Sequence, residues 1–279
     1  MSEMTATAQI TKEDSITARQ AEEFAKYGWI LLREALSPAE QALYYPEIRQ
    51  YVLEVQAAGE GMDALPFKAS DNAKAGERSG QGPDGPTNKT AFSLRAAPPL
   101  VKEFLTSPRL GEIAARLLGV DAVRIMHFTG IFKTPGSAGT PLHQDLTNLP
   151  LDTDRSLTLW IPLVDMGVDM APMMFALGSH VEGQIEDLWA ARSRYPFRQS
   201  GPMKAGDISV HMGWTIHGSL ANGSANTREA FGISYFADGA RIAKRHTKFV
   251  DALMANCFAG LETGEPAASP MNPIVYPVA

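Results

Sequence analysis

The chain is poor in cysteine, basic clusters and long apolar runs, and each absence removes a class of protein. Its single cysteine, Cys257, excludes a disulfide within the chain and favours a reducing compartment. The net charge is −6 and no Lys/Arg-rich run occurs, so we expect no nucleic-acid partner. No stretch approaches the roughly 20 apolar residues that span a bilayer. Residues 1–5 do not resemble a signal peptide, so we expect a cytoplasmic protein without a membrane span.

Composition along the chain predicts one domain preceded by a flexible N-terminal tail. The chain has 279 residues, of which 44% are hydrophobic and 20% charged, so a packed core is expected. Residues 1–14 are small and polar, which predicts a flexible tail before a single domain at 15–279. Residues 59–95 are rich in glycine, which indicates a loop or lid, and the core should lie within 122–240.

Helical spacing of apolar residues dominates the first 120 residues. A capping-box pattern at Thr17 and Gln20 predicts a helix that ends at Gly28. Two further helices are predicted after Ser37 and Ser107, each of which precedes a proline suited to the first helical turn. The N-terminal part of the chain should therefore supply helices.

From about residue 122 the apolar residues follow a period of two, which indicates strands. The candidates are 122–133, 140–146, 156–164, 172–177, 207–211 and 229–237. Helices first and strands afterwards predict an α+β, mainly β chain built around a sandwich or barrel. A double-sheet jelly roll is one such architecture, and its mouth can hold a ligand.

The most informative short pattern is a His-x-Asp pair. His143 and Asp145 are two residues apart, so on a strand their side chains would share one face and could hold one metal ion. His217 and His211 compete for the role of third ligand, and strand parity does not separate them because they are six residues apart. We choose His217. By itself the His-x-Asp pattern is more often an ordinary hydrogen-bonded pair, so the triad needs independent support.

Arg228 gives that support. It begins a predicted strand on which it shares one face with Ala230, Gly232 and Ser234. Small residues beside an arginine leave room for a ligand, and a buried guanidinium needs an anionic partner. A carboxylate is the best geometric match, because the planar fork binds it through two hydrogen bonds. The alternative explanations of this arginine are a structural salt bridge and a solvated strand end.

Taken together, these motifs resemble the phytanoyl-CoA dioxygenase family of Fe(II)/2-oxoglutarate oxygenases. The similar segments, which extend over about 20–240, are 24–32, 37–40, 141–145, 159–163, 177–180 and 206–228. The chain departs from the family pattern at Leu142, where a tryptophan is usual, and in the methionine-rich stretch 169–175. These departures leave the three metal-ligand positions intact, but they prevent a transfer of substrate.

The resemblance implies a double-stranded β-helix (jelly roll, cupin-like) core with the N-terminal helices packed on it. The implied iron ligands and catalytic residues are His143, Asp145 and His217. The residues implied to bind 2-oxoglutarate are Arg228, at its distal carboxylate, with Ser219 and Trp160 beside it. The implied cofactor is Fe(II), and the cosubstrates are 2-oxoglutarate and O2.

The resemblance also implies a reaction, in which a small organic substrate is oxidised while 2-oxoglutarate becomes succinate and CO2. Halogenating relatives lack the carboxylate that Asp145 provides, so hydroxylation is expected, with desaturation, cyclisation and epimerisation left open. The methionine-rich stretch and long loop favour a specialised metabolite as substrate, and a monomer or homodimer is expected. Two alternatives remain: a jelly-roll metalloenzyme that does not use 2-oxoglutarate, and a non-catalytic ligand-binding relative.

Overall fold

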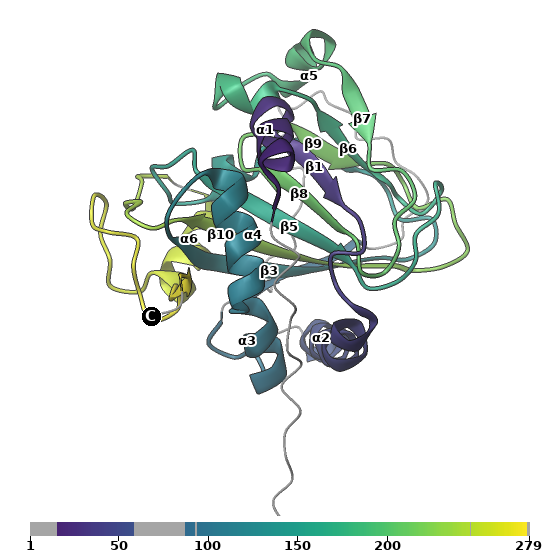
Figure 1. Cartoon of the computed structure of the whole chain (residues 1–279), viewed down its shortest axis with the longest axis horizontal. Coiled ribbons are helices and arrows are strands. Elements are labelled where there is room, and N and C mark those ends of the chain that lie inside the picture. Colours follow the sequence, from purple (N-terminus) through teal and green to yellow (C-terminus); the bar gives the residue numbers. More distant parts are fainter. Residues whose placement is uncertain (1–15, 59–86, 93, 246, 278–279) are drawn as a thin grey trace, which may run out of the picture.

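Two curled antiparallel sheets face each other in this protein (Figure 1). The structure is a computed structural model that describes residues 16–58, 87–92, 94–245 and 247–277. The larger sheet contains, in spatial order, β1 (Trp29–Leu32), β8 (Ile208–Met212), β5 (Ser156–Pro162), β10 (Arg228–Ala237), β3 (Val123–Lys133) and β11 (Ile274–Tyr276), and β2 (Thr87–Phe92) also pairs with β3. The smaller sheet contains β4 (Thr140–His143), β9 (His217–Ser219), β6 (Met173–Ala176) and β7 (Phe197–Gln199). The predicted mainly β fold with a jelly-roll core is confirmed.

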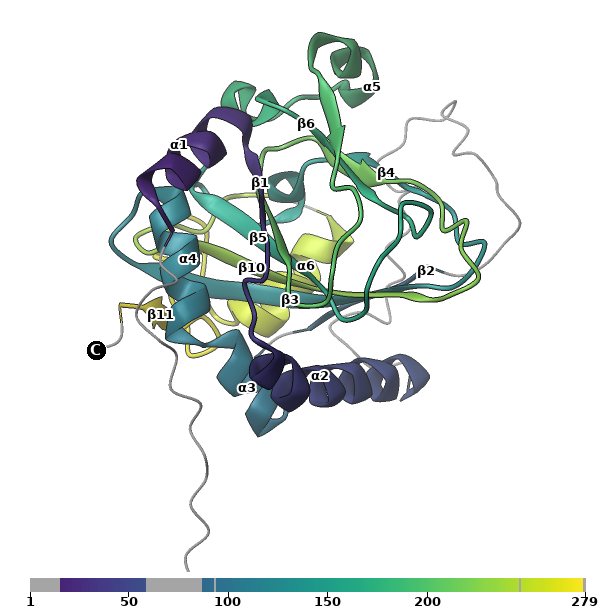
Figure 2. The ribbon, with the colours of Figure 1, turned by 45° about the vertical axis from the view of Figure 1, so that its right-hand side comes forward.

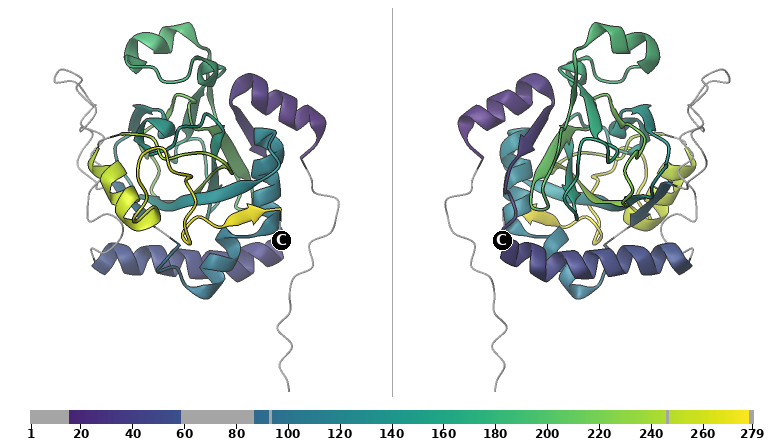
Figure 3. Two further views of the ribbon diagram at one scale, coloured as in Figure 1. Left: turned by 90° about the vertical axis from the view of Figure 1, so that its left-hand side faces the viewer. Right: turned by 90° about the vertical axis from the view of Figure 1, so that its right-hand side faces the viewer.

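Helices cover the outer face of the larger sheet (Figure 2). They are α1 (Ala18–Tyr27), α2 (Pro38–Ala58), α3 (Pro99–Leu105) and α4 (Pro108–Leu118), and α1 lies beside α4 (Figure 3). Helix α6 (Lys248–Cys257) packs on a second apolar cluster. The short helix α5 (Leu188–Ala191) lies between β6 and β7 in the chain. Within the described residues no helix is long and apolar enough to cross a membrane.

The first helix begins and ends where its sequence predicts. The Thr17 hydroxyl accepts a hydrogen bond from the Gln20 backbone N–H, and the Gln20 side-chain oxygen accepts one from the Thr17 backbone N–H. Gly28 ends the helix in the left-handed conformation, with φ of 70°. A Cβ at Gly28 would also lie 2.3 Å from the His180 ring, so this turn requires glycine for conformation and for space.

Strand β10 separates the core from the interior of the jelly roll. Phe231, Ile233 and Tyr235 are fully buried against the helices. Phe231 and Ile233 each contribute roughly 1.5–3 kcal/mol by leaving water. The alternate residues, beginning at Arg228, face the space between the sheets, as the period of two predicts. At Gly232 on this inner face a Cβ would lie 2.7 Å from the Thr129 hydroxyl, so the absence of a side chain makes room in the interior.

Two predicted boundaries differ from the structure. The strand expected over 140–146 ends at His143, and Asp145 begins a 3-10 turn, η2 (Asp145–Asn148), because the Leu146 N–H bonds to Gly213 across the fold and leaves the ladder. The expected flexible tail 1–14 and most of the expected loop 59–95 lie outside the described residues. Residues 87–92 of that loop instead form β2, because backbone pairing with β3 does not require an apolar sequence.

Candidate active site

The sheet register brings three of the predicted residues together. His143 on β4 pairs directly with His217 on β9, and their ring centroids are 4.1 Å apart. Asp145 follows on η2, where its Oδ1 lies 3.5 Å from His143 Nε2 and 3.6 Å from His217 Nε2. One ligand atom from each residue lies within 4.8 Å of the others. Ligands that bind one ion at about 2.1 Å and nearly right angles are about 3 Å apart, so these three residues could hold a metal ion.

Backbone carbonyls orient both imidazoles. The Nδ1 of His143 lies 2.9 Å from the Pro141 carbonyl, and the Nδ1 of His217 lies 2.9 Å from the Thr215 carbonyl. Since a carbonyl only accepts, each Nδ1 carries the proton and donates it. Each Nε2 is therefore left with a lone pair toward Asp145. A ring nitrogen fixed in this way is the usual arrangement of a metal-binding histidine.

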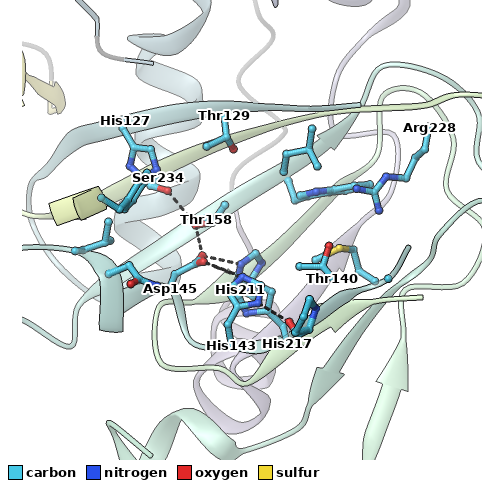
Figure 4. A pocket seen from close by; sticks show the side chains of 18 residues that line it. His127, Thr129, Thr140, His143, Asp145, Thr158, His211, His217, Arg228 and Ser234 are labelled. Atoms are coloured by element: carbon cyan, nitrogen blue, oxygen red, sulfur yellow. Dashed lines mark hydrogen bonds and ion pairs between the residues drawn. The ribbon is translucent and has the colours of Figure 1, made fainter. Parts of the chain in front are cut away.

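Two side chains on the opposite sheet hold the other oxygen of Asp145. The Thr158 hydroxyl donates to Oδ2 at 3.0 Å, and His211 Nε2 donates to the same oxygen at 3.1 Å. Thr158 and His211 pair directly across β5 and β8, so the strand register places the two donors side by side, within reach of the same Asp145 oxygen (Figure 4). These bonds leave Oδ1 directed at His143 and His217. His211, the competing candidate for third ligand, is instead a hydrogen-bond donor to the carboxylate.

The protonation of the cluster suits metal binding. Burial alone would raise the pKa of Asp145, but His217 and the neighbouring His143 and His211 hold that pKa well below its usual range. Burial, reinforced by the neighbouring His143 and His211, holds the pKa of His217 well below its usual value. At neutral pH the cluster therefore presents a carboxylate and a neutral His217 imidazole, which are the forms that bind metals.

Arg228 lies at the other end of the same cavity (Figure 4). Only 1% of it is exposed, and its Nη1 donates to the Ala171 carbonyl at 2.8 Å. Burial lowers the pKa of Arg228 to about 9, so the guanidinium remains cationic at neutral pH. It lies 5.2 Å from the centre of the Trp160 ring. Within the described residues Arg228 Nε and Trp160 Nε1 are buried without an acceptor, and both residues line the cavity, which fits an anionic ligand.

Ser219 has a different position from the one expected. Its hydroxyl accepts a hydrogen bond from Lys133 Nζ at 2.9 Å and lies 3.1 Å from the Thr140 hydroxyl. Thr140 lines the cavity and Ser219 does not, so Ser219 reaches the cavity only through Thr140. Lys133 is fully buried and pairs with Arg228 across β3 and β10.

Several polar residues at the cavity had no role in the sequence interpretation. The cavity has a volume of about 160 Å³, and these residues are His127, Thr129, Thr140, Asn148 and Thr158. The alternation of side chains along a strand could have identified His127 and Thr129, because both lie on the inner face of β3. Parity alone could not place that face next to Asp145, since that depends on which strands pair.

Comparisons with known proteins agree with this geometry. The model of the family described as phytanoyl-CoA dioxygenase (PhyH) matches residues 24–230. A search of curated protein sequences finds no match. The non-heme alpha ketoglutarate dependent epimerase SnoN from nogalamycin biosynthesis is a similar solved structure, with 22% identity, a TM-score of 0.72, and coverage of 92% of this chain and 97% of SnoN.

Two further solved structures share the fold. The carbocyclase SnoK from the same biosynthesis has 24% identity and a TM-score of 0.73, with 93% of this chain and 96% of SnoK covered. EctD from S. alaskensis, solved with 2-oxoglutarate and 5-hydroxyectoine, has 18% identity and a TM-score of 0.65, with 95% of this chain and 89% of EctD covered. At these identities the likeness establishes the jelly-roll fold. Because the family model matches most of the chain, the protein belongs to the phytanoyl-CoA dioxygenase family of enzymes that depend on iron and 2-oxoglutarate.

Proposed function

We propose that this enzyme hydroxylates a small organic substrate, a specialised metabolite, and forms succinate and CO2 as co-products. The observation that carries the proposal is that one cavity contains both a three-residue ligand cluster and a buried, cationic Arg228 with an unpartnered donor. A metal site alone fits many enzymes. A metal site that shares its cavity with a buried carboxylate receptor favours a 2-oxoglutarate-dependent one.

The proposed iron ligands are Nε2 of His143, Oδ1 of Asp145 and Nε2 of His217. The fit rests on the spacing of these atoms and on the carbonyls that fix both imidazoles. Two histidines and one carboxylate leave the remaining positions of a six-coordinate ion to other ligands. Bound iron would supply the oxygen chemistry that no side chain in the cavity can perform.

Arg228 and Trp160 are the proposed receptor for the distal carboxylate of 2-oxoglutarate. Their unpartnered Nε and Nε1 donors would each gain an acceptor, and the fixed guanidinium would set the length and direction of the bound molecule. In this proposal Ser219 acts indirectly, because its hydroxyl holds Thr140 at the wall of the cavity. The enclosed position of Arg228 would keep water from competing for the carboxylate.

Hydroxylation is the proposed outcome because Asp145 completes the set of three protein ligands. The scaffold itself does not fix the outcome, since the similar structures include an enzyme named as an epimerase and one named as a carbocyclase. Both come from nogalamycin biosynthesis, which supports a specialised metabolite as substrate. Product analysis by mass spectrometry would distinguish a gain of one oxygen from a loss of two hydrogens.

An anaerobic titration with Fe(II) and then 2-oxoglutarate tests the proposal through the weak visible charge-transfer band of the chelate. The wild-type protein should develop the band, and His217→Ala should bind too little iron to do so. Arg228→Met should need about tenfold or more 2-oxoglutarate, because it loses a hydrogen bond to a charged group. Arg228→Lys serves as the control that keeps the charge without the planar fork. An iron-loaded wild-type protein that gives no band at saturating 2-oxoglutarate would contradict the proposal.

A further inference from the structure

The larger sheet presents a row of buried polar side chains to the cavity. His127 pairs with Ser234 across β3 and β10, Ser234 pairs with Thr158 across β10 and β5, and Thr158 pairs with His211 across β5 and β8. Ser234 lies six residues after Arg228 on β10, which separates their backbones by about 20 Å. The row therefore lies beside Asp145, away from the end of the cavity at which Arg228 would hold 2-oxoglutarate (Figure 4).

Two further polar side chains at the cavity lack partners. Thr129 is 7% exposed and Asn148 is 8% exposed, and both line the cavity. Within the part of the chain that the structure describes, neither side chain makes a hydrogen bond. The Thr129 hydroxyl occupies the space above Gly232, where a Cβ would lie 2.7 Å away. The polar atoms of Thr129 and Asn148 are not among the fully enclosed side-chain atoms without a partner, so they remain accessible from the cavity and can bond a ligand there.

The charge of the cavity restricts the chemistry of that ligand. Among the described lining residues, Asp145 and Arg228 are the only Asp, Glu, Lys or Arg side chains. Both already have roles in the proposed metal and 2-oxoglutarate sites, so no permanent charge remains for a charged substrate group. Leu149 and Phe249 provide apolar surface in the same cavity, and the Phe249 ring lies edge-on to His127 at 5.9 Å.

We propose that Asn148, Thr129 and Ser234 form a substrate subsite for an uncharged oxygen group, a hydroxyl or a carbonyl. The carbon skeleton of the substrate would lie against Phe249 and Leu149. The Asn148 amide and the Thr129 hydroxyl can both donate and accept. Ser234 donates its proton to Thr158, whose own proton bonds Asp145, so Ser234 is left to accept a hydrogen bond. Together the three residues can bond both the proton and the oxygen of an alcohol. This inference rests on the proposed function, since it assigns the space left beside the metal ligands once 2-oxoglutarate occupies the Arg228 end.

Four probes of similar size test the subsite: benzyl alcohol, ethylbenzene, benzoate and benzylamine. Each would be titrated into protein that carries redox-inert Zn(II) and 2-oxoglutarate, with affinity measured by saturation-transfer NMR. Benzyl alcohol should bind roughly two- to tenfold more tightly than ethylbenzene, as expected for one or two neutral hydrogen bonds. Benzoate and benzylamine should bind more weakly than benzyl alcohol, because the subsite offers no opposite charge.

Matched variants assign the preference to this subsite. Asn148→Leu and Thr129→Val should each reduce the affinity for benzyl alcohol toward that for ethylbenzene, while Thr129→Ser should retain the preference. Unchanged binding of ethylbenzene in each variant verifies that the cavity is intact. Calorimetry of Zn(II) and 2-oxoglutarate is done first, so a failure of the proposed cofactor site is seen separately. Equal binding of the alcohol and ethylbenzene, tighter binding of a charged probe, no binding of any probe, or a preference that survives both substitutions overturns the inference.

Discussion

Replacement of Thr158 by valine removes one hydroxyl and leaves the shape of the side chain nearly unchanged. That hydroxyl donates to Asp145 Oδ2 at 3.0 Å, opposite the second donor, His211. With both donors present, Oδ2 is occupied and Oδ1 is the oxygen available to the metal. Without Thr158 the carboxylate can rotate, and binding of the ion must then also fix its orientation.

The expected magnitude follows from the hydrogen bond and its exposure. A hydrogen bond to a charged group contributes about 1.5–3 kcal/mol. The Asp145 side chain is 22% exposed, so water can partly replace the lost donor and the lower value applies. A loss of about 1.5 kcal/mol weakens metal binding about tenfold. His211→Phe, at a side chain only 2% exposed, should approach the upper value, about 100-fold.

Isothermal titration with Mn(II), which avoids oxidation of iron, measures both effects. Thr158→Ser is the matched control, because it keeps the donor, and its Kd should stay within about twofold of the wild-type value. The reasoning is refuted if Thr158→Val binds Mn(II) as tightly as the wild-type protein. That result would mean that the ion itself, rather than the two donors, orients the carboxylate.

Three further predictions concern metal-linked stability, interior space and the cysteine. Mn(II) at 100 times its Kd should raise the free energy of unfolding by about 2.7 kcal/mol, and excess EDTA should reverse the shift in a thermal melt. Gly232→Ala should destabilise the protein by about 1–3 kcal/mol in urea denaturation, because its Cβ would lie 2.7 Å from the Thr129 hydroxyl; an unchanged midpoint would mean that Thr129 moves freely. Burial raises the pKa of Cys257 to about 12, so iodoacetamide at pH 8 should label the urea-unfolded chain and leave the native one unmodified; rapid native labelling would contradict this burial.

Local patterns in the sequence predicted the elements that depend on neighbouring residues. The capping box at Thr17 and the left-handed Gly28 fix the first helix through contacts within a few positions of the chain. The alternation along β10 is equally local, and it correctly placed Arg228 and Ser234 on one face, which lines the cavity. Three-residue strands such as β7 and β9 are too short to show a period, so the sequence did not predict them.

The sequence by itself named His143, Asp145 and His217 but could not determine how they meet. Strand parity was the wrong reason for the position of Asp145, which lies on a 3-10 turn after the strand ends. Nor could parity separate His211 from His217; the structure does, because the chain crosses from β8 in one sheet to β9 in the other between them. Pairing between strands is a nonlocal property that no short sequence pattern contains. The sequence thus determined the chemistry of the cluster, and only the tertiary structure decided its geometry and the donors that orient it.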